Sequence, residues 1–196
     1  MPILFTILSM PIVCSMKPLY ILVFVGLSYF AKAQSSSFTI TMNGIEELKL
    51  GMKKEELEKL INQNISLSHS DRKGVAPLLD TVHVNYKGLE TDIVFAKQYT
   101  GENSYDLIIQ EIECNSDMLR TKKGICIGDD KLKVISTYEG FTLWLVPGYL
   151  DDSYTTKSKN RSSIWLHGDT TDSAIIFRLE NNKVVSMSVC YYEKGG

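Results

Sequence analysis

The segment LKLGMKKEELEKLI (residues 48–61) changes its hydrophobic spacing at Gly51. After this glycine, Leu57, Leu60 and Ile61 lie three and four positions apart, which places them on one face of a helix. Lysine and glutamate residues occupy the remaining positions and would form a solvated face. Because glycine adopts a tight turn without crowding the backbone, the pattern predicts a short extended lead, a turn and a helix.

Most of the remaining chain follows the two-residue period of strands that have one buried face. In YDLIIQEIEC (105–114) the apolar set is Ile108, Ile112 and Cys114, with Gln110 between. In KVVSMSVCYY (183–192) the corresponding set is Val185, Met187, Val189 and Tyr191. The strands predicted in this way are 81–87, 91–97, 105–114, 140–147, 162–167, 173–180 and 183–192.

These elements recur along the chain. Aligning Gly51 with Gly128 gives an offset of 77, and the same offset superimposes the alternating residues of the strands 105–114 and 183–192. Asp130 follows Gly128 at a position where its carboxylate can cap the first turn of a helix. We therefore assign structural roles to Gly51, Gly128 and Asp130.

The predicted fold class is α+β, with two tandem units that could share one sheet. Each unit is a helix, or a helical hairpin, packed on an antiparallel β-meander. Residues 34–43 would be a flexible lead-in, residues 44–121 the first repeat unit and residues 122–196 the second.

The N-terminal 33 residues have the composition of a secretory signal peptide. They contain no acidic residue, and Lys17 precedes an apolar run of 12 residues, 19–30, which is followed by Ala31-Lys32-Ala33. Such a run is shorter than a membrane span, which needs about 20 residues. Translation starting at Met16 would give a more typical signal peptide; the alternative is a long signal or an uncleaved anchor over residues 3–31. The expected location is periplasmic or secreted.

The chain that would remain, residues 34–196, has 19 basic and 23 acidic side chains and a net charge of −4. It shows no basic stripe, which argues against nucleic acid and anionic membranes as partners, with membrane contact limited to the transient signal peptide. Three cysteines fall in this part of the chain: Cys114, Cys126 and Cys190. One disulfide and three separate thiols are both compatible with their spacing.

The sequence contains no motif that is typical of a catalytic or metal site. His69, His83 and His167 are the candidate bases, and SHSD (68–71) brings serine, histidine and aspartate together. Catalytic triads, however, are assembled by the fold rather than by adjacent residues, and neither a G-x-S-x-G nor an H-E-x-x-H motif is present. We expect no cofactor, no metal and no catalytic residue.

A candidate binding surface arises from residues that alternate with the predicted core. Trp144, Trp165, His167 and Tyr192 would lie on the sheet face that the helix leaves uncovered. Aromatic rings with polar ends bury a large area at a small entropy cost, so they are common in protein and glycan recognition. The alternative is that a loop or the other unit packs over them.

The pattern G-M-x-x-x-E-[LV] followed by a meander resembles the SmpA/BamE family of small outer-membrane lipoproteins. The doubled plan is similar to that of the β-lactamase inhibitory proteins, and KKGICIGDDKLKV (122–134) resembles a segment found in many exported bacterial proteins. The chain departs from the first family in having Lys53 where Ser or Thr is usual, and in lacking the lipidated cysteine.

The resemblance implies a non-enzymatic, exported protein that binds an unknown protein partner in the envelope or outside the cell, as an inhibitor or adaptor does. One alternative is a carbohydrate-binding module or a hydrolase that uses the Trp144/Trp165 face. The other is a structural component of the envelope akin to BamE.

Overall fold

A computed structural model describes residues 37–67, 80–101, 104–150, 155–169 and 172–192. Of these residues, 57% lie in strands and 11% in two helices, so the protein is mostly β. The predicted α+β class, with a helix packed on each meander, is therefore wrong. The predicted signal peptide, residues 1–33, lies outside the described residues, among which no helix is long and apolar enough to span a membrane.

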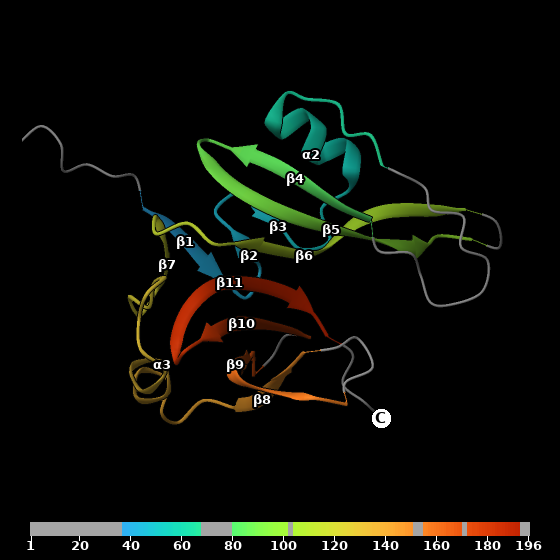
Figure 1. Cartoon of the computed structure of the whole chain (residues 1–196). Helices are drawn as coiled ribbons and strands as arrows, with labels where there is room; N and C mark the ends of the chain where they lie inside the picture. Colours follow the sequence, from blue (N-terminus) through green and yellow to red (C-terminus); the bar gives the residue numbers. More distant parts are fainter. Residues whose placement is uncertain (1–36, 68–79, 102–103, 151–154, 170–171, 193–196) are drawn as a thin grey trace, which may run out of the picture. The chain divides into compact units, whose positions relative to one another are not determined.

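Seven strands form one antiparallel sheet in the order β4-β5-β6-β11-β10-β9-β8 (Figure 1). Each strand predicted from the two-residue period is present, with ends shifted by a few residues. Their bounds are β4 Asp80–Tyr86, β5 Leu89–Tyr99, β6 Tyr105–Cys114, β8 Leu143–Tyr149, β9 Lys157–His167, β10 Ser173–Glu180 and β11 Lys183–Tyr191.

A second, four-stranded sheet in the order β3-β2-β1-β7 was not predicted. Its strands are β1 Phe38–Thr41, β2 Gly44–Ile45, β3 Leu48–Lys49 and β7 Leu119–Thr121. Strand β1 pairs with β7 in parallel, across about 80 residues of sequence. Residues 38–41, expected in a flexible lead-in, are thus part of a sheet, with Phe38 and Ile40 buried.

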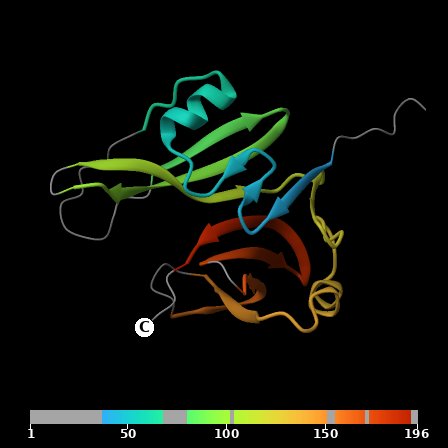
Figure 2. The ribbon, with the colours of Figure 1, turned by 180° about the vertical axis from the view of Figure 1, so that it is seen from behind.

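The two helices are short: α2 spans Lys54–Ile61 and α3 spans Lys131–Thr137. Each buries a single residue fully, Leu57 in α2 and Val134 in α3. Figures 1 and 2 show α2 beside β4–β6 and α3 beside the strands of the other half of the sheet. Since neither helix is large enough to cover a meander, the four-stranded sheet supplies much of the remaining cover, and all contribute to one hydrophobic core.

The segments around Gly51 and Gly128 make the same main-chain contacts. Gly51 N donates to Ile109 O at 2.8 Å, and Ile109 N donates to Met52 O at 2.9 Å. In the other half, Gly128 N donates to Val184 O at 2.8 Å, and Val184 N donates to the carbonyl of the residue after Gly128 at 2.9 Å. Each glycine segment thereby pairs with a strand that comes later in the chain, the Gly51 segment with β6 and the Gly128 segment with β11.

A β-bulge follows each of these contacts. The register between β5 and β6 shifts at Gln110, and the register between β10 and β11 shifts at Val185. The bulges move the buried face of each strand by one residue, so Ile109 and Val184 enter the core. The predicted inward positions Ile108 and Val185 are therefore wrong, and Tyr191 is exposed as well, while Ile112, Cys114, Met187 and Val189 are buried as expected.

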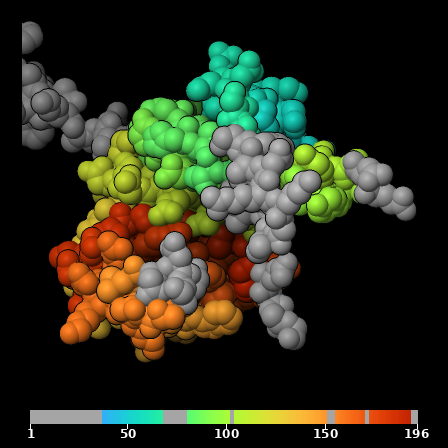
Figure 3. All heavy atoms as spheres, turned by 45° about the vertical axis from the view of Figure 1, so that its right-hand side comes forward, coloured from blue at the N-terminus to red at the C-terminus, as the bar shows by residue number. Residues whose placement is uncertain are grey.

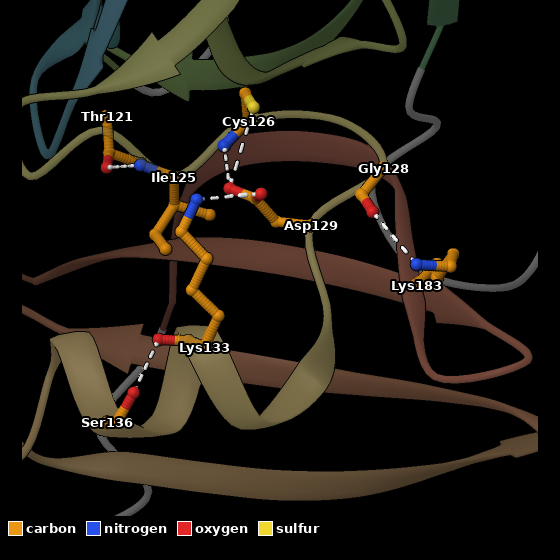
Figure 4. A network of polar contacts seen from close by, with 8 residues as sticks. All are labelled: Thr121, Ile125, Cys126, Gly128, Asp129, Lys133, Ser136 and Lys183. Atoms are coloured by element: carbon orange, nitrogen blue, oxygen red, sulfur yellow. Dashed lines mark hydrogen bonds and ion pairs between the residues drawn. The ribbon is translucent and has the colours of Figure 1, made fainter.

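The turn before α3 is held by side-chain contacts (Figure 4). Asp129 accepts hydrogen bonds from Cys126 N at 2.9 Å and from Lys133 Nζ at 2.8 Å. Burial alone would raise the pKa of Asp129, but the contacts with Lys133 and Cys126 outweigh it and the pKa is lowered. Asp130 is the N-cap residue, and its carboxylate accepts from Leu132 N at 3.0 Å.

Candidate binding surface

The seven-stranded sheet carries a continuous row of cross-strand neighbours on the face opposite the core. Register places one residue of each strand in this row, and side chains of paired residues point to the same face. From the β8 edge to the β4 edge, the row consists of Trp144, Trp165, Ile176, Ser188, Glu113, Asp92 and His83. We call this face the open face; it is aromatic and apolar at one end and charged at the other.

The four aromatic residues singled out in the sequence lie together at the β8 end. The ring centroid of His167 is 4.0 Å from that of Trp144, 4.5 Å from that of Tyr192 and 6.2 Å from that of Trp165. His167 is buried, at 4% exposure, whereas Trp144 is 54% exposed. The histidine thus lies beneath the rings of its neighbours, and Trp144 forms the outer surface of the cluster.

Strand β8 is an edge of the sheet and exposes apolar side chains on both faces. Leu145, which points away from Trp144, is 55% exposed. Pro147 lies near the end of the strand and removes one amide donor from it. A sheet edge with large apolar groups on both faces is unusual in a protein that acts alone, because such edges invite pairing with another chain.

Trp165 also forms one wall of a groove. Its Nε1 donates a hydrogen bond to Ser163 Oγ at 3.1 Å, which fixes the indole along the strand. The groove has a volume of about 490 Å³ and is lined by Trp165, Ile176 and Val185, with Arg161, Arg178 and Glu180 around them. The open face therefore holds two distinct features, the aromatic cluster around His167 and the groove beside Trp165.

In the middle of the open face, Arg178 is held by two carboxylates. Its Nη2 lies 3.0 Å from Glu111 Oε1 and 3.3 Å from Glu113 Oε2, and its Nη1 donates to Ser188 Oγ at 3.1 Å. Glu113 is directly opposite Asp92, a pairing of like charges that costs stability in a sheet unless a cation compensates it. Arg178 supplies that compensation on one side and His83 on the other.

His83 lies between two carboxylates at the β4 edge. Its Nδ1 is 2.9 Å from Asp92 Oδ1, and its Nε2 is 2.6 Å from Glu90 Oε2. The hydrogen bond with Asp92, followed by that with Glu90, raises the pKa of His83 above 6.5. The folded protein therefore favours the protonated imidazole more strongly than the unfolded chain does.

Because the pKa of His83 is raised on folding, its contribution to stability is complete below the unfolded-state pKa and is lost as pH rises through the folded-state pKa. We expect the difference in unfolding free energy between wild type and His83→Gln to shrink as the pH rises above about 6.5, the usual pKa of histidine. Urea unfolding at several pH values measures this difference. A difference that does not vary with pH would contradict the assignment.

The two halves of the sheet carry opposite charge, which the net charge of −2 for the whole chain conceals. Strands β4–β6 contain six carboxylates and one lysine; strands β8–β11 contain five cations and one carboxylate. The space-filling view shows green residues of the first half above orange and red residues of the second (Figure 3). The cations are Lys157, Lys159, Arg161, Arg178 and Lys183.

The other residues that the sequence analysis singled out lie away from the open face or outside the described residues. Gly51 and Gly128 are in turns with positive φ, at +77° and +87°, and Asp130 caps α3, so these three residues act on the fold. Residues 68–71 lie outside the described residues. Within the described ranges, no cluster of three or more histidine, cysteine or acidic side chains could hold a metal ion.

The three cysteines in the described part of the chain are free thiols. Burial raises the pKa of Cys114, and it raises that of Cys190 to about 12. Both thiols stay protonated at neutral pH and pack as small apolar groups. Cys126 is partly exposed, and its Sγ lies 3.5 Å from Asp129 Oδ2.

Comparisons with protein-family models, with curated proteins and with solved structures find no match to this chain. The resemblance to the SmpA/BamE family and to β-lactamase inhibitory proteins therefore stays a prediction.

Proposed function

We propose that the protein is exported and binds another protein through the β8 edge of its seven-stranded sheet, without catalysing a reaction. The observation that carries this proposal is the exposure of Trp144 and Leu145 on opposite faces of one edge strand. A partner that covers this edge would bury apolar groups on both faces at once.

The packing of the aromatic cluster supports this role. The Trp144 ring lies against His167 and at 6.5 Å from the ring of Tyr192, so its position is set before a partner arrives. Side chains that are already ordered lose little conformational entropy on binding. Tyr192 is itself held, since its amide donates to Asp172 O at 3.0 Å.

The proposal is tested by Trp144→Ser in affinity capture from envelope extract and culture fluid of the organism that produces the protein. We expect a protein recovered with the wild type to be lost with this variant. A tryptophan that becomes buried at the centre of an interface commonly contributes about 2 kcal/mol or more to the binding free energy. Quantitative mass spectrometry of the captured proteins measures the loss.

Leu132→Ser is the matched control. Leu132 is 73% exposed on α3, so its replacement removes a similar exposed apolar group away from β8. Recovery of the same proteins, in the same amounts, by Trp144→Ser and by wild type would refute binding through this edge, provided that both variants unfold at the same urea concentration as wild type.

A further inference from the structure

The extra residues at the two bulges of the sheet lie in different surroundings. Gln110, at the first bulge, donates through Nε2 to Tyr191 O at 3.1 Å. Val185, at the second, is 42% exposed and lines the groove beside Trp165. Bulges commonly redirect a side chain next to a binding site. The second bulge therefore places the exposed side chain of Val185 at this groove.

The groove has an apolar interior with one flat aromatic wall. Trp165 forms the wall, Ile176 is a buried neighbour of it in the next strand, and Val185 extends the apolar surface toward β11. The hydrogen bond from Trp165 to Ser163 keeps the indole in one orientation. A volume of about 490 Å³ is within the range of small-molecule sites.

The rim of the groove is polar but electrically balanced. Arg161 and Glu180 are directly opposite in β9 and β10, and Arg161 Nε lies 3.5 Å from Glu180 Oε1. Their side chains are 61% and 43% exposed, so both have hydrogen-bonding capacity available to a ligand. Arg178, on the same face, already has its charge compensated by Glu111 and Glu113.

Close packing fixes the backbone at the rim. A Cβ atom on Gly148 would lie 2.6 Å from Arg161 Cβ and 2.8 Å from Arg161 O, so only glycine permits this approach of β8. Arg161 N also donates to Ser158 Oγ at 3.1 Å. The guanidinium therefore extends from a backbone position that is held from two directions.

We infer that this groove binds a neutral pyranose sugar, a function beyond the proposed protein contact. A pyranose has an apolar face of C–H groups that stacks on an indole, and its hydroxyl groups would reach Arg161 and Glu180 at the rim. A carboxylated or sulfated ligand suits the site less well, because Glu180 balances Arg161. Arg161 and Glu180 together offer hydrogen-bond donors beside acceptors, and adjacent sugar hydroxyl groups, which both donate and accept, can bond to both.

The chain's two tryptophans make a direct test available. In Trp144→Phe, Trp165 is the single indole, and its fluorescence reports on the groove. The probes are methyl glycosides of glucose, galactose, mannose and xylose, with methyl glucuronide as the anionic comparison. We expect a saturable change with at least one neutral glycoside and a dissociation constant on the order of 1 mM, as suits a small ligand in an open groove.

Arg161→Met and Glu180→Leu, each in the Trp144→Phe background, should weaken that binding by about tenfold or more, since each removes a charged hydrogen-bonding group from the rim. Lys159→Met, a change of a neighbouring cation that does not line the groove, should leave it unchanged. The inference is overturned if no neutral glycoside gives a saturable signal up to about 50 mM. It is also overturned if methyl glucuronide binds more tightly than every neutral probe, or if both rim variants bind as the Trp144→Phe protein does.

Discussion

Gly44→Ala should destabilise the protein by about 4 kcal/mol or more, one of the two largest effects we expect from a single substitution. Gly44 has a φ of +139°, and a Cβ atom there would lie 1.9 Å from the carbonyl oxygen of Leu48. That oxygen belongs to the main chain of the paired strand β3, so it cannot rotate away. Relief requires the β2–β3 hairpin to open, which would expose Ile45 and Leu48, both fully buried.

Gly128→Ala and Gly51→Ala provide a graded comparison for this prediction. Gly128 has a φ of +87° with no atom within 4 Å of an added Cβ, so its replacement should cost only the conformational strain, about 1 to 2 kcal/mol. At Gly51 the added Cβ would meet Tyr191 Oη at 2.9 Å, a movable side-chain end, and the cost should be intermediate. Urea unfolding of the three variants measures the order; similar losses at all three positions would contradict the steric explanation.

Phe177→Ala should destabilise the protein by about 3 to 5 kcal/mol, since it removes a large ring from the core and leaves a cavity. Phe177 is fully buried in β10, between Ile164 of β9 and Met187 of β11, which are also fully buried. Its ring centroid lies 5.9 Å from that of Tyr138, at the end of α3. The substitution therefore weakens the contact between the sheet and its helical cover.

Phe141→Ala is the control for this prediction. Phe141 packs edge-on against the same Tyr138, at 5.7 Å between centroids, but is 43% exposed, so its loss should cost about 1 kcal/mol. Both variants are compared with wild type by urea unfolding at equal protein concentration. Equal losses for the two phenylalanines would show that burial in the sheet core does not govern stability at Phe177.

Local periodicity located the strands well but misjudged the faces of two of them. In β6 and β11 the alternation predicted Ile108 and Val185 as inward residues, whereas the bulges at Gln110 and Val185 place Ile109 and Val184 in the core. A bulge adds one residue to one strand only, and its position depends on the partner strand. Reading a single strand therefore cannot locate it.

The helices were predicted in the right places but were given too large a role. The apolar spacing after Gly51 does form α2, yet only Leu57 is fully buried in it. The cover of the core depends on β1, whose parallel partner β7 lies far along the chain. Pairing of this kind is set by three-dimensional proximity, so the segment 38–41 looked like a tail when considered alone.

The sequence by itself determined the strand segments, the turn glycines and the residues on each side of most strands, because a two-residue period and a positive φ are local properties of the chain. Tertiary structure alone decided that the β1–β7 pairing completes the core, that His167 lies beneath Trp144, and that β6 pairs with β11, so the acidic and the basic strands form one sheet. These features join residues that are distant in sequence, and they arise from strand order and register, which local spacing does not encode.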